Sequence, residues 1–559
     1  MKLFKKITLV LLSLIHISEP TLVLCAASLA SCSDFFEQTP DNMLDADDNY
    51  TERSNIYASF MGLYGTLQDV APKLVVTSEL WGDLLTPTDQ APDSYWEVFR
   101  YDVQPDNSVA DPAPLYRIVM NCNDFMRNTI EYNKSYPGVI PTTTYRQMIA
   151  GAVALRTWAY LNIGKLYGKA VYYDYAMTGE TDLSKLPVLT FDELIPELIH
   201  FMNTGVDNIN GLRRVDINTM FGTTGIWNSI AISPDALLCE LYLWNKDYES
   251  AAKRGINLIT GQALTPAGDN NKFTLSEQFG KTKQWSSLFS DTPANPQTNE
   301  GLTMVLYDYS QRQINPLYSL FSSETVCEYY MKPTAVLTSR FSLRADYQMT
   351  GSQVAKDPRT DPVTFTTSMG ESVFNKYNYI RSIQSQDAPI YLYRAAEIHL
   401  MIAEALSAMG NYDAADAILN DGFQPYWVSG NRYNPPFDAP IYAYEKLKAG
   451  RGVRGRLSLP AVRSTDERFM GALDPGSPEY AGRRRQVLDS LIIEETGREL
   501  AGEGKRWFTI MRMARNSNNP SMLARMIMRK FPVAERPAYY AKLKDPANWF
   551  IDYDLKLDK

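Results

Sequence analysis

The chain has 559 residues, of which 45% are hydrophobic and 21% charged, and its formal net charge is −9. This length exceeds a single hydrophobic core of about 250–300 residues, so it indicates several cores or a repeat architecture, and the composition excludes wholesale disorder. The acidic balance excludes a typical nucleic-acid-binding protein. Only three histidines are present, which leaves little room for zinc sites or Ser-His-Asp triads. We therefore expect no nucleic acid partner, no cofactor, no metal site and no catalytic residue.

Residues 1–31 have the pattern of a secretory signal peptide. Three lysines among the first six residues precede the apolar run 7–15, and small residues follow. This run is well below the about 18 residues of a membrane-spanning helix. The segment ends in Leu-Ala-Ser-Cys at positions 29–32, which resembles the bacterial lipobox. We expect lipid attachment at Cys32, followed by a polar tether over 32–50.

Helical patterns dominate the next part of the chain, 51–260, and return at 391–559. Apolar residues recur at spacings of three and four, as expected for one face of a helix, at Ala152, Leu155, Ala159, Ile163 and Leu166.

Two helical stretches, 237–259 and 399–419, resemble each other. Each reads as a helix, a short polar turn, an aromatic residue (Tyr248 or Tyr412) and a second helix that carries alanines. This pattern is typical of tetratricopeptide repeats, in which small residues let neighbouring helices approach closely. The two turns lie far apart in the sequence, so we expect long insertions between repeats.

Two segments, 261–390 and 421–482, have the composition of insertions. Gly, Pro, Ser and Thr punctuate the first, which also contains short β-type runs such as 304–307, and the second is rich in Pro, Gly and Tyr. Insertions in a repeat scaffold often form its binding face. The sequence thus predicts a mainly α, tetratricopeptide-like scaffold with loop-rich insertions that carry minor β structure, and it predicts the ligand face at 261–390.

Several motifs along the chain resemble those of one known family. They are Ala58–Tyr64, Leu80–Asp83, Leu115–Asn123, Ala154–Gly168, Ala396–Leu406 and Arg498–Phe508. The family is SusD/RagB, the surface lipoproteins of Bacteroidetes that bind nutrients, usually glycans. Thr509 departs from the family's usual Asp, and the resemblance weakens after Arg515. The resemblance implies a surface-exposed position on the outer membrane and a SusC-like TonB-dependent transporter as partner.

Charged residues inside these motifs are interpreted as structural. They lie on or beside helices that also carry core residues, where buried ion pairs orient the helices. Perturbed carboxylates occur in such networks as well as in active sites, and we favour the structural role. The residues are Glu397, Glu404, Arg498, Glu499, Glu503 and Arg506.

Aromatic and polar residues outside the helical stripes are the predicted ligand-binding residues. Sugar rings stack their CH faces on aromatic side chains, and loop aromatics are stronger functional hints than helix aromatics. The candidates are Trp81, Asp83, Tyr95 and Trp96 in a Pro-punctuated segment, with Asp89, Gln90 and Asp93 beside them, and Trp285, Tyr307 and Tyr309 in the insertion, with Tyr329 and Tyr330. For each aromatic the alternative is packing in the core. The core is expected to hold Trp158, Trp244, Trp507 and Cys239, and His399 and His200 are expected to be core or boundary histidines.

The sequence therefore favours a protein that binds oligosaccharides or polysaccharides and is not an enzyme. Two alternatives remain open at this point. One is a glycoside hydrolase that uses a pair of carboxylates about 5–10 Å apart. The other is a helical repeat scaffold whose groove binds peptides or proteins.

Overall fold

The computed structural model describes residues 50–177, 185–260, 273, 275, 278–279, 282–293, 300–342, 357–368, 371–422, 452–457 and 459–552. The predicted signal peptide, Cys32 and nearly all of the predicted tether lie outside these residues. The chain divides into two compact units, residues 1–57 and 58–559. Apart from the start of α4 (Arg53–Gly65), every described helix and strand belongs to the second unit.

Long helices form the first part of this unit. They are α5 (Leu67–Trp81), α7 (Ala113–Ser135), α8 (Thr142–Tyr167) and α9 (Phe191–Thr204), and α8 packs between α7 and α9. Because α8 has neighbours on several sides, its side chains from 148 to 167 are all buried. Gly168 ends α8 with a φ of +69°, and a Cβ there would lie 2.6 Å from the ring of Phe550. Glycine is therefore required both by the backbone and by the close approach.

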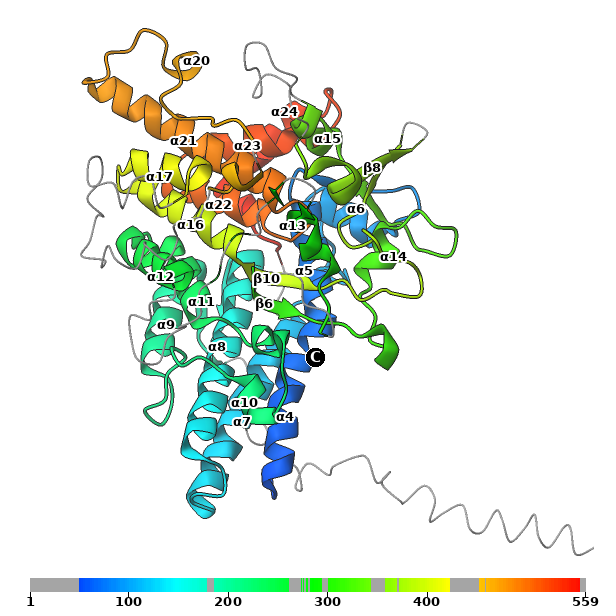
Figure 1. Cartoon of the computed structure of the whole chain (residues 1–559), viewed down its shortest axis with the longest axis vertical. Helices are drawn as coiled ribbons and strands as arrows, with labels where there is room; N and C mark the ends of the chain where they lie inside the picture. Colours follow the sequence, from blue (N-terminus) through cyan, green and yellow to red (C-terminus); the bar gives the residue numbers. More distant parts are fainter. Residues whose placement is uncertain are drawn as a thin grey trace, which may run out of the picture. The chain divides into compact units, whose positions relative to one another are not determined.

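The two similar sequence stretches form two helical hairpins that lie side by side (Figure 1). The first hairpin is α11 (Pro234–Trp244) with α12 (Tyr248–Thr260), and the second is α16 (Ala395–Ala408) with α17 (Tyr412–Asn420). Helix α12 packs against α16, so the insertion leaves the stacking of the repeats intact. A Cβ at Gly255 of α12 would lie 2.5 Å from Cγ1 of Ile402 in α16. The predicted repeat-like scaffold is confirmed.

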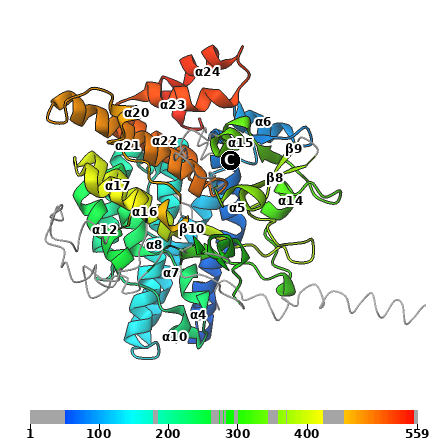
Figure 2. The same ribbon diagram turned by 45° about the horizontal axis from the view of Figure 1, so that its top comes forward.

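The remaining long helices follow the second hairpin. Helix α21 (Pro478–Glu499) packs against both α16 and α17, and α22 (Arg506–Asn516), α23 (Pro520–Ile527) and α24 (Arg536–Leu543) follow it, orange to red in Figure 2. The shorter α-helices are α6 (Asp93–Phe99), α10 (Ile217–Phe221), α13 (Gln284–Ser287), α14 (Leu317–Phe321), α15 (Ala335–Ser342) and α20 (Glu467–Met470).

Short antiparallel strand pairs supply the minor β structure that the sequence predicts. The pairs are β1 (Leu85–Pro87) with β7 (Met331–Pro333), β2 (Lys169–Val171) with β3 (Val188–Thr190), β4 (Gln278–Phe279) with β5 (Thr282–Lys283), β6 (Gly301–Val305) with β10 (Ile390–Arg394), and β8 (Phe365–Ser368) with β9 (Glu371–Phe374). The β1–β7 pair joins the segment after α5 to the insertion. In the part of the chain that the structure describes, no helix is both long and apolar enough to cross a bilayer.

Candidate functional site

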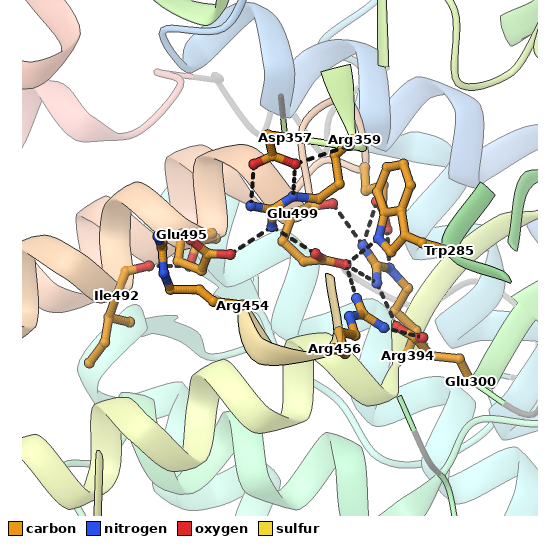
Figure 3. Close-up of polar contacts among 12 residues, drawn as sticks. Trp285, Glu300, Asp357, Arg359, Arg394, Arg454, Arg456, Ile492, Glu495 and Glu499 are labelled. Carbon is orange, nitrogen blue, oxygen red and sulfur yellow. Dashed lines mark hydrogen bonds and ion pairs between the residues drawn. The ribbon is translucent and has the colours of Figure 1, made fainter. Parts of the chain in front are cut away.

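A buried ion-pair cluster centres on Glu499 at the end of α21 (Figure 3). Arg394 donates to its carboxylate at 2.7 Å and Arg359 at 2.9 Å, and Arg456 makes a third contact. The indole of Trp285 donates to the same carboxylate at 2.9 Å. Burial alone would raise the pKa of Glu499, but the three arginines hold it well below the usual value. The carboxylate is therefore charged and fully paired.

The cluster contains as many acidic side chains as basic ones. Its ion pairs join five acids, Glu300, Asp357, Glu495, Glu499 and Glu503, to five bases, Arg359, Lys376, Arg394, Arg454 and Arg456. All ten side chains are buried. The members come from α21 and the turn after it, β10, the insertion and the loop after α17, so the cluster fixes these segments to one another. Loss of one partner would leave an unpaired buried charge, at a cost of about 3–5 kcal/mol.

The predicted ion-pair role is also confirmed at other motif residues. Glu404 in α16 binds Arg512 in α22 through two contacts of 2.7 and 2.9 Å, and Glu397 pairs with Lys505 at 2.9 Å. The guanidinium of Arg498 donates two contacts at 3.4 Å to the backbone carbonyl of Arg340. These residues join helices that are distant in sequence, which is a structural role.

Trp81, Asp83 and Trp285, three of the predicted ligand residues, are buried away from the cleft described below. Trp81 is 3% exposed and packs edge-to-face on Trp507 at 5.9 Å between ring centroids. Asp83 is 1% exposed and accepts two hydrogen bonds from Arg506, at 2.8 and 3.0 Å. Trp285 belongs to the ion-pair cluster. Trp81 and Asp83 present no surface to a ligand in this structure, because α5 extends to Trp81 and its end is packed against α22. Trp285 is 1% exposed because it packs within the cluster around Glu499. We leave all three out of the proposed site.

The residues expected in the core are there, whereas His200, expected in the core or at its boundary, is exposed on α9. The side chains of Trp158, Trp244, Trp507, Cys239 and His399 are all buried. His399 Nδ1 lies 2.7 Å from the carbonyl oxygen of Ala395, and burial lowers its pKa to about 4. The imidazole is therefore neutral near pH 7, and it is enclosed by helix packing.

A cleft of about 850 Å³ opens along α5, where the segment after this helix meets the insertion. Its lining includes Tyr95 and Tyr307, one from each predicted group. The Tyr307 hydroxyl donates to the carbonyl of Gln68 at 2.9 Å, and the Gln68 side chain donates to the carbonyl of Leu306 at 2.8 Å. Burial raises the pKa of both tyrosines, so their hydroxyls keep their protons. The two contacts fix the insertion against α5.

The β1–β7 pair brings the two predicted groups of residues together. Next to this pair, the backbone N–H of Thr88 donates to the carbonyl of Tyr330 at 2.9 Å. The ring of Tyr330 then meets Tyr95 edge-to-face, with 5.3 Å between centroids. Tyr329 is buried. The acids and amide of the first group, Asp89, Gln90 and Asp93, are exposed.

A loop of the insertion, residues 308–316, forms one rim of the cleft. Asp308 accepts from the backbone N–H of Ser310 at 2.9 Å, which closes a turn. The buried side chain of Asn315 donates to the carbonyl of Ala388 at 2.8 Å and so anchors the end of the loop. Tyr309, a predicted site residue, is 38% exposed in this loop. Trp96 does not line the cleft; it is half-buried, with the Arg100 guanidinium 4.9 Å from its ring centroid.

The lining of the cleft mixes polar and apolar groups. The polar members are Thr66, Gln68, Asp69, Lys73, Ser94, Ser108, Arg117, Arg312 and Gln313. The apolar members include Val70, Pro72, Val76, Pro92, Ile314 and Leu320. A cavity that combines apolar walls with a few convergent polar groups is suited to bind a small ligand.

A smaller pocket of about 200 Å³ adjoins the cleft and shares Gln68, Tyr307 and Gln313 with it. The half-buried Trp227 lines this pocket. Sequence analysis missed Trp227, although it follows a Gly- and Thr-rich loop and the preference for loop aromatics would have selected it. It also missed the basic residues of the cleft, because an isolated lysine or arginine carries no sequence signal.

Residues 326–546 match the model of the SusD family. This match covers less than half of the chain and shows a likeness to the SusD family in the C-terminal part. The match extends past Arg515, where the motif resemblance weakens. No curated protein sequence matches the chain significantly.

Solved structures of SusD-like proteins share the fold of this chain. A SusD superfamily protein from Bacteroides thetaiotaomicron is 18% identical, with a TM-score of 0.58 over 88% of this chain and 97% of that one. One from Bacteroides vulgatus is 12% identical, with a TM-score of 0.57 over 90% and 96%. A protein described as a laminarin-binding SusD-like protein is 14% identical, with a TM-score of 0.53 over 88% and 98%.

Proposed function

We propose that this protein is a surface lipoprotein that binds oligosaccharides or polysaccharides in the cleft along α5 and delivers them to a SusC-like TonB-dependent transporter. The observation that carries the proposal is the cleft itself, which lies where the predicted ligand face meets the N-terminal helices. The description of one solved structure of the same fold as laminarin-binding supports a glycan as the class of ligand.

The chemistry of the cleft suits a sugar chain. Tyr95 in the cleft and the half-buried Trp227 in the adjoining pocket supply the aromatic contacts, each being worth about 0.5–1.5 kcal/mol by analogy with aromatic pairs. Tyr307 is 2% exposed and holds the insertion against α5. Gln68 and Gln313 offer amide donors and acceptors for hydroxyl groups. A site of a few such contacts binds weakly, and a partner transporter would raise the overall affinity through its own contacts.

The cleft favours binding over hydrolysis. A glycosidase of the usual kind needs two carboxylates on either side of the bond that it cleaves. Among the described residues that line the cleft, Asp69 is the only carboxylate. A single exposed acid on a helix can bind a hydroxyl but cannot supply both an acid and a base or nucleophile.

The membrane attachment belongs to the same proposal. Cys32 would carry the lipid, and the following polar residues would hold the folded unit away from the membrane surface. A Cys32→Ala variant is expected to leave the membrane fraction of cells while it keeps its ligand affinity. Continued partition of this variant into membranes would contradict the proposed anchor.

An affinity-gel screen with neutral and acidic polysaccharides tests the ligand class. We expect at least one polysaccharide to retard the purified protein, and the double variant Tyr309→Ala, Gln313→Ala to weaken that retardation by about tenfold or more. Both positions are exposed on loop 308–316, so the fold is expected to persist. Tyr136→Ala, which removes an exposed ring at the end of α7, is the matched control.

Two results would contradict the proposed function. The first is that no polysaccharide retards the wild-type protein, which would favour the scaffold that binds peptides or proteins. The second is that the purified protein releases reducing sugar from a polysaccharide that it binds, which would favour the hydrolase.

A further inference from the structure

Three basic side chains line the cleft. Lys73 comes from α5, Arg117 from the first turns of α7, and Arg312 from loop 308–316. Against these three positive charges, the described lining contains one negative charge, that of Asp69, which leaves a net charge of +2. The whole chain has a formal net charge of −9. The cleft is therefore positive within an acidic protein.

All three basic side chains are exposed, and none makes a hydrogen bond or an ion pair with another residue that the structure describes. Lys73 lies one helical turn after Asp69 on α5, yet the two do not form an ion pair. In contrast, the basic residues of the buried cluster are bound to carboxylates. The donors of the cleft are therefore available to a ligand.

The adjoining pocket adds one acid, Asp308. Its carboxylate is already engaged, since it accepts from the backbone N–H of Ser310 at 2.9 Å and from the Ser310 hydroxyl at 2.6 Å. If its charge is counted, the combined lining remains positive, with three positive and two negative charges. Asp308 thus reduces the positive field without pairing with Arg312.

The charge of the cleft points to a class of sugar. A hydroxyl group both donates and accepts, so a neutral sugar is matched by groups of both kinds, whereas a carboxylate or sulfate only accepts. Lysine and arginine only donate, and the arginine fork fits planar and tetrahedral oxyanions. Clefts lined by one sign of charge also raise the local concentration of ligands of the opposite sign.

We propose that the cleft selects anionic glycans, which carry carboxylate or sulfate groups, and that Lys73, Arg117 and Arg312 contact those groups. This inference rests on the proposed glycan-binding function. It makes the three basic residues specificity determinants, while Tyr95 and Trp227 contact the sugar rings irrespective of their charge.

Binding should be measured by calorimetry with pairs of glycans that differ in charge alone. Suitable probes are oligogalacturonides and their methyl esters, and sulfated galactan and chondroitin sulfate fragments with their desulfated forms. We expect at least one charged member to bind at least about tenfold more tightly than its uncharged counterpart, since one charge-assisted contact is worth about that factor. The preference should shrink as the salt concentration rises.

A triple variant, Lys73→Gln, Arg117→Gln and Arg312→Gln, should remove the preference, so that the charged and uncharged members of each pair bind within about twofold of each other. The control variant changes Lys134, Arg146 and Lys246 to Gln. These three residues are exposed and lie outside the cleft lining, and their replacement lowers the net charge by the same amount. We expect the control to keep the preference.

The outcomes separate this inference from the proposed function. Binding of uncharged glycans as tightly as charged ones, or a preference that survives in the triple variant, would overturn the inference and leave glycan binding in place. Equal binding of a polyglutamate peptide would also overturn it, because the cleft would then recognise charge without sugar. Failure of every glycan, charged or not, would contradict the proposed function itself.

Discussion

Glu79 in α5 provides the sharpest test of how burial of a carboxyl group changes the free energy of unfolding. Its side chain is fully buried, and one carboxylate oxygen accepts from the backbone N–H of Gly504 at 2.8 Å. The other oxygen has no hydrogen-bond partner among the described residues. Burial raises the pKa of Glu79 from its ordinary value of 4.5 to about 7. The folded state therefore holds a proton on this group that the unfolded chain releases.

The effect of Glu79 on stability follows from this difference. Because the folded pKa is raised, the free energy of unfolding falls as the pH rises from about 4.5, and the loss is complete above about pH 7. The pKa difference of about 2.5, at about 1.4 kcal/mol for each pKa unit, lowers the free energy of unfolding by about 3 kcal/mol. Glu79→Gln removes the titration and keeps an oxygen for Gly504. We expect this variant to be more stable than wild type by up to about 3 kcal/mol at pH 8.

Urea denaturation followed by tryptophan fluorescence measures the difference at pH 4.5, 6 and 8. The gain should shrink on acidification and vanish near pH 4.5, where wild type is itself protonated. Glu131→Gln, which removes an exposed carboxylate from α7, should leave stability within about 0.5 kcal/mol of wild type. A Glu79→Gln variant that is no more stable at pH 8, or a gain that is independent of pH, would refute the reasoning.

Three further predictions concern the fold. Burial lowers the pKa of His399 to about 4, so the free energy of unfolding falls as the pH falls from about 6.5 to 4. His399→Gln removes this titration, and its urea midpoint should change less than that of wild type between these pH values. Gly502→Ala should lower the free energy of unfolding, measured in urea, by about 2–4 kcal/mol, because Gly502 has a φ of +74° and a Cβ there would overlap the ring of Phe374. Gly410 has a φ of +80° but lies in open space, so Gly410→Ala should lower the free energy of unfolding by only about 1 kcal/mol. Arg512→Met should lower the free energy of unfolding, measured by thermal denaturation, by about 3–5 kcal/mol, because it leaves the buried Glu404 unpaired. The double variant Arg512→Met, Glu404→Leu should recover most of this loss.

The helical part of the fold could be predicted because its signals are local. The similar stretches around Tyr248 and Tyr412 each carry a helix pair and its turn, and both hairpins form as expected. Glu404 was predictable as an ion-pair residue, since a charge among core residues of a helix needs a partner. The sequence did not indicate which residue would be that partner, because Arg512 lies in a different helix.

The candidate site could be predicted only in part. Tyr95 and Tyr307 were selected as loop aromatics, and both line the cleft. Trp81 and Asp83 have the same local pattern, yet both are buried by contacts with α22, which is more than 400 residues away in the chain. Lys73 carries no signal at all, because the cleft that it lines exists only once the insertion, with Tyr307 and loop 308–316, packs against α5.

The central claim is that sugar binds in the cleft along α5, and the structure of a complex tests it most directly. A crystal grown with the tightest-binding glycan should show sugar rings between α5 and loop 308–316, with Gln313 and at least one of Lys73, Arg117 and Arg312 within hydrogen-bond distance. A glycan bound elsewhere, with the cleft empty, would contradict the account.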